Sequence, residues 1–189
     1  DPRDGGSRRM SDIGRFCAVI PAVFETEADP VLVSGQDIAE LIAAARQAPA
    51  GRARLILHPD RDDTLHEMVI ALPPDSCDHP HINFKSGKSF LALSGQFGVM
   101  TFSDDGSDVR SFVLSADNQS AGARVVRLRK PAWHTIIPLS GDTVFLETIV
   151  GPFNGNRFAP WFPSADRADE RKAWSEQLRR LAKDAAQRG

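Results

Sequence analysis

The residues best suited to chemistry are histidines grouped in the middle of the chain. His79 and His81 flank Pro80, and Asn83 follows two positions later. Because successive side chains of an extended strand point to opposite faces, His79, His81 and Asn83 are expected to share one face. His134 lies on a later segment and could join them. Imidazoles gathered inside a β-barrel are typical of a divalent-metal site.

Other polar side chains of the same region are candidates for binding a small ligand. Arg52 and Arg54 are two residues apart, so on one strand they would share a face and could grip a phosphate or carboxylate. Paired arginines on a strand are also typical of a plain solvated face. Asn83 and Glu147 are the remaining candidate ligand-binding residues.

The overall composition is typical of one soluble domain. The chain has 189 residues, of which 41% are hydrophobic and 25% are charged. A net charge of −2 argues against general nucleic-acid binding, which needs a strongly basic surface. No apolar run approaches the roughly 18 residues that cross a bilayer, and no stretch is typical of a signal peptide. Cys17 and Cys77 form no motif, so a reducing, cytoplasmic setting is expected.

The first part of the chain is predicted to hold an arm, a strand and a helix. Residues 1–14 are rich in Gly, Ser, Asp and Arg and are expected to form a mobile arm. Within residues 15–51, Phe16 to Val23 is a candidate edge strand, limited by Pro21. Ser34 and Asp37 resemble a capping box. The apolar stripe of a helix follows, and Pro49 ends it: Ile38, Leu41, Ile42 and Ala45.

Residues 52–150 change to a hydrophobic period of two, which predicts strands. Short strands without intervening helices favour an antiparallel sandwich or barrel. The predicted strands are Arg54 to Leu57, Glu67 to Leu72, Ser89 to Leu93, Gly98 to Phe102, Val109 to Leu114, Arg124 to Leu128, His134 to Pro138 and Val144 to Ile149. The predicted turns between them include Ser94-Gly95 and Ser140-Gly141-Asp142.

Residues 151–189 are expected to form a strap and a second helix outside the barrel. Aromatic and proline residues from Phe158 to Pro163 would lie over the barrel surface. Ser164 is a candidate N-cap of an amphipathic helix. Its apolar stripe would dock on the barrel or bind a partner: Trp174, Leu178, Leu181 and Ala185.

The histidine region resembles the first cupin motif, H-x-H-x3/4-E-x6-G. His81 and Gly95 stand at the two ends of that frame, and His134 matches the histidine of the second cupin motif. Asn83 stands in place of the second histidine, and Lys88 in place of the glutamate. Of the four ligands that the resemblance would carry over, only His81 and His134 remain.

More narrowly, the chain resembles the WbuC-type cupins that are found with O-antigen and sugar-biosynthesis genes. The resemblance implies a jelly-roll barrel, a carbohydrate-related ligand in its lumen and a homodimer. It covers roughly residues 52–163 and is carried by Arg52-Ala53-Arg54, His58, Leu65-His66-Glu67-Met68, Pro80-His81, Ser89-Phe90, Asp104-Asp105-Gly106, Trp133-His134-Thr135, Gly151-Pro152-Phe153 and Phe158-Ala159-Pro160-Trp161.

The first function that these residues leave open is a WbuC-like cupin that binds a small polar ligand, with metal ligation degenerate or absent. For this function the resemblance implies a parallel with the metal-free sugar-nucleotide epimerases and isomerases of the superfamily. His81 or His134 would then transfer a proton, and Lys88 would hold developing negative charge. A barrel that has lost its chemistry and serves as a binding or assembly module is a further alternative.

The other alternative is a metal-dependent cupin enzyme with a remodelled site of His79, His81 and His134. Lys88 opposes it, because two like unit charges about 4 Å apart repel by about 4 kcal/mol at an effective dielectric of 20. Further side chains on or near the predicted strands could replace the missing ligands: His58, His66, Glu67 and Glu147.

Overall fold

The computed structural model describes residues 12–120 and 122–188, so residues 1–11 of the predicted mobile arm lie outside the described part of the chain. The described residues form ten strands and two helices. The strands are β1 (Cys17–Ile20), β2 (Val23–Glu25), β3 (Ala53–Ile56), β4 (Leu65–Leu72), β5 (His81–Ile82), β6 (Lys88–Phe102), β7 (Val109–Ser115), β8 (Val125–Arg127), β9 (Trp133–Val150) and β10 (Arg157–Phe158). The helices are α1 (Gly35–Gln47) and α2 (Ala168–Arg188).

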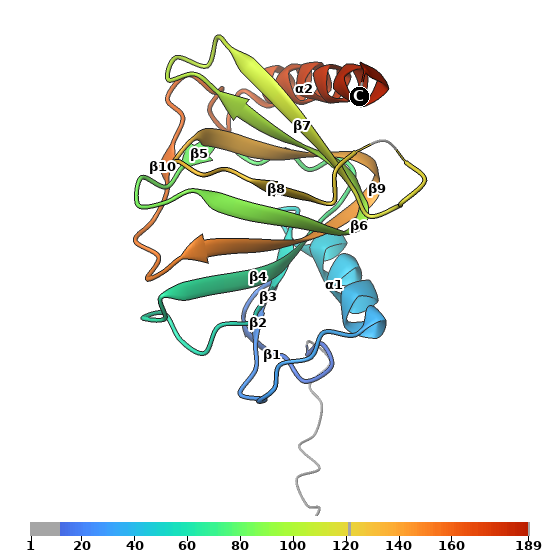
Figure 1. Cartoon of the computed structure of the whole chain (residues 1–189), viewed down its shortest axis with the longest axis vertical. Helices are drawn as coiled ribbons and strands as arrows, with labels where there is room; N and C mark the ends of the chain where they lie inside the picture. The colour runs from blue at the N-terminus through green and yellow to red at the C-terminus, as the bar shows by residue number, and fades with distance from the viewer. Residues whose placement is uncertain (1–11, 121, 189) are drawn as a thin grey trace, which may run out of the picture.

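The two longest strands, β6 and β9, each take part in two sheets. The second half of β9 pairs with β4 and with the first half of β6, and this α1-side sheet continues through β3, β2 and β1 at one edge and β8 at the other. The first half of β9 pairs with the second half of β6 and with β5, and this α2-side sheet ends at β7 and β10. The strands lie between the two helices (Figure 1). The predicted fold class, a mainly β jelly-roll barrel with a helix outside at each end of the chain, is confirmed.

The bends in β6 and β9 show that two predicted turns are wrong. Ser94-Gly95 and Ser140-Gly141-Asp142 do not separate strands, because β6 and β9 run through them. The pairing shifts register between Ala92 and Phe97, and Gly95 and Gly141 have φ values of 74° and 59°. Glycine adopts this left-handed conformation without steric cost, so each site is a bend that carries its strand from one sheet to the other.

Helix α1 covers the outer face of the α1-side sheet. The predicted capping box is present: Ser34 Oγ accepts from the Asp37 backbone N–H, and the Asp37 carboxylate accepts from the Ser34 N–H. Leu41 and Ala45 are fully buried in a cluster with Leu55 of β3. The apolar stripe is therefore a core contact.

Helix α2 covers the outer face of the α2-side sheet, where Leu178 and Ala182 are buried. The docking face differs from the predicted stripe, because Leu181 is 36% exposed and Ser175 is buried. A Cβ on Gly98 of β6 would lie 2.9 Å from the Cβ of Ala182, so the glycine permits the helix to approach the sheet. Neither helix of the described residues is long and apolar enough to span a membrane.

The interior between the two sheets is apolar over most of its length and polar at one end. The apolar part consists of Leu72, Phe90, Ala92, Phe97, Val99, Leu114, Ile136 and Phe145. The polar end lies where β5 and β10 complete the α2-side sheet, at the left of Figure 1.

Candidate functional site

A pair of histidines forms the centre of the polar end. His81 on β5 lies directly opposite His134 on β9, and their ring centroids are 4.5 Å apart. His81 Nδ1 lies 3.1 Å from the His79 carbonyl oxygen, and His134 Nδ1 lies 2.9 Å from that of Ala132. A carbonyl only accepts hydrogen bonds, so these contacts assign the proton of each neutral ring to Nδ1. Each Nε2 therefore carries a lone pair.

Burial keeps both imidazoles neutral at physiological pH. The pKa of His134 lies well below the usual value of about 6.5, because of burial first and then of the charges of Lys88 and His81. Burial and Lys88 also lower the pKa of His81. The Nε2 of His134 is buried and has no hydrogen-bond partner among the described residues. It is thus a proton acceptor without a proton donor.

Lys88 lies inside the barrel, as the sequence predicts, and it is paired. Its Nζ lies 3.3 Å from Glu147 Oε2, with side-chain exposures of 5% and 11%. The cupin frame places Lys88 where a carboxylate would stand, and the structure supplies that carboxylate from β9 instead. The ammonium is close enough to His81 and His134 to lower the pKa of both imidazoles. The polar end therefore holds its own fixed cation.

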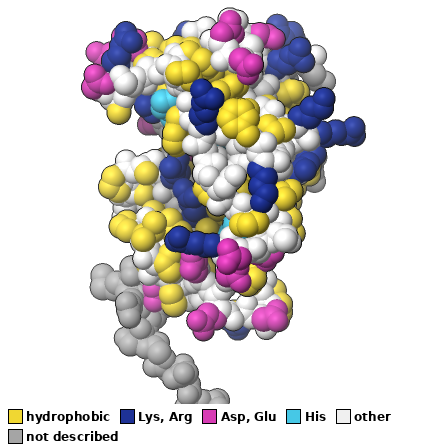
Figure 2. Space-filling model, turned by 90° about the vertical axis from the view of Figure 1, so that its left-hand side faces the viewer, with side chains coloured by type: hydrophobic (Ala, Val, Ile, Leu, Met, Phe, Trp, Pro, Cys, Tyr) yellow, Lys and Arg dark blue, Asp and Glu magenta, His cyan; other side chains and the backbone are white. Residues whose placement is uncertain are grey.

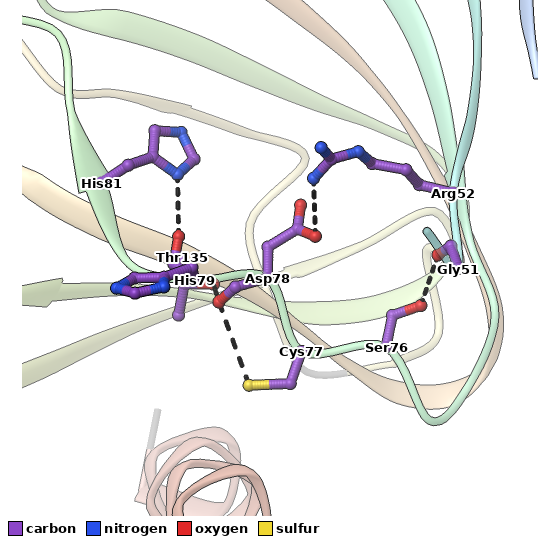
Figure 3. A network of polar contacts seen from close by, with 8 residues as sticks. All are labelled: Gly51, Arg52, Ser76, Cys77, Asp78, His79, His81 and Thr135. Carbon is purple, nitrogen blue, oxygen red and sulfur yellow. Dashed lines mark hydrogen bonds and ion pairs between the residues drawn. The ribbon is translucent and has the colours of Figure 1, made fainter. Parts of the chain in front are cut away.

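Two arginines add positive charge from the α1-side sheet. Arg52 Nη1 lies 2.8 Å from Asp78 Oδ1. Figure 3 shows the side chains of Arg52, Asp78 and His81 directed into the same space. On β3, Arg54 alternates with Ala53 and Leu55, which pack toward α1, so its side chain faces the interior. Burial and the charge of Arg52 lower the pKa of Arg54.

Arg54 leaves the polar end with a surplus of positive charge. No ion pair of Arg54 is present within 4.0 Å among the described residues, whereas Lys88 pairs with Glu147 and Arg52 with Asp78. Three cations thus face two carboxylates, while both imidazoles are neutral. Arg54 is half-buried, and the two carboxylates that act on its charge, Glu147 and Asp78, are already paired with Lys88 and Arg52, so this arrangement favours an anionic ligand.

His79 and Asn83 lie elsewhere than the shared strand face predicts. His79 precedes β5, and its Nε2 donates to the Ala159 carbonyl oxygen at 2.8 Å. Figure 3 shows the rings of His79 and His81 pointing in different directions. Asn83 Nδ2 donates to the Gly155 carbonyl oxygen at 3.2 Å, and its Oδ1 accepts from the Lys85 N–H at 2.9 Å. Both side chains bond to loop backbones. They do not share a strand face with His81, because β5 consists only of His81 and Ile82.

These residues do not form a ready metal site. No group of three or more His, Cys, Asp and Glu side chains in residues 12–120 and 122–188 is arranged to hold a metal ion. His79 is turned to Ala159, so the proposed set of His79, His81 and His134 is not assembled. The ammonium of Lys88 beside the two imidazoles would also repel a divalent cation.

Sequence reasoning missed Asp78 and the stacking of His58 on His66. Asp78 lies on the loop before β5, and its backbone carbonyl accepts from Thr135 Oγ1 at 2.8 Å. The rings of His58 and His66 are parallel, with centroids 3.9 Å apart. Among residues 12–120 and 122–188 this pair is not part of any group of three or more possible metal ligands, so it does not replace the missing ones.

Comparisons with known proteins give one family match over part of the chain. Residues 33–114 match a family described as a domain of unknown function, DUF6016. No curated protein matches the chain. Among solved structures, an oxalate oxidase in complex with the substrate analogue glycolate is 14% identical over 72% of this chain and 75% of that chain, with a TM-score of 0.48. An oxalate decarboxylase from Bacillus subtilis, studied for its Mn(II) centres, is 17% identical over 51% of this chain and 24% of that chain, with a TM-score of 0.41.

Proposed function

We propose that this chain is a WbuC-like member of the cupin superfamily that binds a small, carbohydrate-related oxyanion at the polar end of its barrel. The family assignment rests on the H-x-H-type frame from His81 to Gly95 together with His134. The ligand class rests on the charges around that frame. A carboxylate or phosphate would compensate the surplus cation, and sugar hydroxyls would hydrogen-bond the imidazoles.

The observation that carries this proposal is the surplus of positive charge at the half-buried Arg54. Its guanidinium faces the interior and has no ion pair within 4.0 Å among the described residues, because the carboxylates that act on its charge, Asp78 and Glu147, pair with Arg52 and Lys88. An arginine binds carboxylate and phosphate groups through two parallel hydrogen bonds. The ligand is therefore expected to present such a group toward β3.

Isothermal titration calorimetry tests the proposal with galacturonate, inorganic phosphate and neutral galactose. Galacturonate should bind, inorganic phosphate more weakly, and galactose least. Arg54→Met should weaken galacturonate binding by about ten- to a hundredfold, as loss of a charged hydrogen bond predicts. Arg180→Met on the exposed face of α2 is the control and should leave binding unchanged. Equal binding of galactose and galacturonate would refute the ligand class.

The unpartnered Nε2 of His134 favours a second candidate function, proton transfer. A neutral imidazole beside an ammonium can take a proton from a carbon next to a carboxylate or carbonyl. Lys88 would stabilise the enolate oxygen, and the imidazolium would return the proton. Proton NMR in deuterated water would show exchange of that hydrogen. His134→Gln should stop the exchange while galacturonate binding persists, and exchange that continues would refute this role.

A further inference from the structure

An exposed phenylalanine ends the row of side chains that contains the histidine pair. Phe158 of β10 lies directly opposite His81 of β5, and His81 lies directly opposite His134 of β9. Residues directly opposite each other on paired strands point to the same face of a sheet. The ring centroid of Phe158 is 6.1 Å from that of His81, and His134 packs against Phe90 of the apolar interior. The three rings therefore form one row on the inner face of the α2-side sheet.

This row runs from the interior of the barrel to its surface. His134 is 3% exposed, His81 is half-buried, and Phe158 is 58% exposed. In the described part of the chain, β10 is the last strand at this edge of the sheet, so no further strand pairs beyond Phe158. A ligand that lies on Phe158 is therefore adjacent to an imidazole that solvent partly reaches.

The exposed ring is held in place by a second histidine. The ring centroids of His79 and Phe158 are 5.4 Å apart, with the two planes at 63°. His79 is itself fixed, because its Nε2 donates to the Ala159 carbonyl oxygen and its ring packs against Phe162 with centroids 4.9 Å apart. A side chain that is already ordered loses little conformational freedom when a ligand binds to it. His79 thus positions Phe158, although the sequence predicts it as a metal ligand.

A polar group that suits a ligand lies beside this apolar ring. Nδ1 of His81 is bonded to the His79 carbonyl oxygen, and its Nε2 has no hydrogen-bond partner among the described residues. The carboxylates that act on the charge of Arg54, Asp78 and Glu147, also act on that of His81. A sugar presents an apolar C–H face and hydroxyl groups together, so it matches an aromatic ring beside an imidazole.

The surface at this end of the molecule suits an acidic sugar. Residues 79–103 and 118–141 contain no Asp or Glu. Figure 2 shows this end, with hydrophobic side chains, Lys and Arg mixed across the middle of the face and Asp and Glu toward its top and bottom. Apolar and basic side chains in one area match a ligand that has both a C–H face and a negative group.

We infer that Phe158 is the specificity-determining residue on which the sugar ring of the ligand stacks, with a hydroxyl of that ring bonded to His81. The inference rests on the proposed function and names a carbohydrate-recognising side chain that lies outside the H-x-H-type frame. The negative face of the phenyl ring attracts the C–H groups of a pyranose, and stacking removes apolar surface of both from water. Phe158 therefore selects ligands with a sugar ring over simple oxyanions.

Calorimetric titration of the full chain with galacturonate and with inorganic phosphate tests this inference, because phosphate has no ring. Phe158→Ala should weaken galacturonate binding about three- to tenfold and leave phosphate binding unchanged. Phe158→Tyr keeps the aromatic face and should bind galacturonate as the unchanged protein does. The matched control is Phe112→Ala at the opposite, β7 edge of the same sheet, where a 39% exposed ring lies opposite Val99; it should leave both affinities unchanged.

Proton NMR of galacturonate reports where its ring lies. The C–H protons that lie over the phenyl face should shift upfield when galacturonate binds, and this shift should vanish in Phe158→Ala. Equal losses of affinity for galacturonate and phosphate in Phe158→Ala would mean that the substitution distorts the site as a whole, and would overturn the stacking role.

Unchanged galacturonate affinity in Phe158→Ala, with binding still lost in Arg54→Met, would overturn the stacking role and leave the proposed function standing. Failure of the unchanged protein to bind either anion would overturn the proposed function and the stacking role with it. Sedimentation velocity examines the other occupant of an exposed aromatic ring, a second copy of the chain. If Phe158→Ala converts a dimer to a monomer without a change in galacturonate affinity, the ring belongs to an interface and the inference is wrong.

Discussion

The buried ion pair between Lys88 and Glu147 allows one prediction to be worked out in full. The two charged atoms are 3.3 Å apart, and neither side chain is more than 11% exposed. At an effective dielectric of 20, two unit charges at this distance attract by about 5 kcal/mol. Removal of one partner leaves the other charge buried without compensation, which typically costs about 3–5 kcal/mol. Lys88→Met should therefore destabilise the fold by about that amount.

The double variant Lys88→Met/Glu147→Leu should recover most of this loss, because two apolar side chains fill a similar volume without the cost of desolvating charges. Urea unfolding at neutral pH gives the free energy of unfolding for each variant. Arg167, just before α2, and Glu170, in its first turn, form an exposed ion pair with side-chain exposures of 57% and 49%. Arg167→Met is thus the control and should change stability by less than about 1 kcal/mol.

Two results would refute the reasoning about this pair. If Lys88→Met costs less than about 1 kcal/mol, the ammonium is solvated rather than buried. If the effects of Lys88→Met and Glu147→Leu simply add in the double variant, the two side chains do not interact. Either result would contradict the interpretation of Lys88 as a buried cation that Glu147 holds at the polar end.

Three further predictions follow from the same geometry. The pKa of His134 is depressed in the folded state, so below about pH 6.5 the unfolded chain binds a proton that the folded chain does not. Stability should fall as the pH drops below that value, by up to about 1.4 kcal/mol per pH unit for this group, and urea unfolding of His134→Gln should show a shallower slope. Lys88→Glu places a carboxylate beside both imidazoles and should raise the affinity for Zn²⁺ in titration calorimetry, and no gain would count against a shared interior. Gly98→Val should push α2 away and lower the melting temperature by an amount that corresponds to about 1–3 kcal/mol, whereas Gly35→Ala, where nothing lies within 4 Å, should be neutral.

The fold could be predicted from the sequence because its signals are local. The capping box at Ser34 and the apolar stripe behind it define α1 without help from distant residues. The strands likewise show their period of two. The turns at Gly95 and Gly141 were mistaken because a glycine with positive φ serves equally in a reverse turn and in a bulge. Only the pairing of β6 with β9 decides between the two, and that pairing is long-range.

The site could be predicted only in part, for the same reason. The meeting of His81 and His134 followed from the cupin frame, and the structure pairs them directly. The partner of Lys88 could not be read from the frame, since Glu147 reaches it through the register of β9 against β6. His79 was misplaced because a shared strand face requires a strand, and β5 begins only at His81.

Lys88 stands beside the two histidines that the cupin-like frame retains, at the position where that frame would have its glutamate. In a metal site, a bound cation lowers the basicity of the imidazoles and attracts anions. Here the ammonium of Lys88 has both effects. It lowers the pKa of His81 and His134, and it attracts an anion, the carboxylate of Glu147. A chelator cannot remove a side chain. Galacturonate binding should therefore be unchanged after dialysis against EDTA, and a loss that Zn²⁺ or Mn²⁺ restores would refute this interpretation.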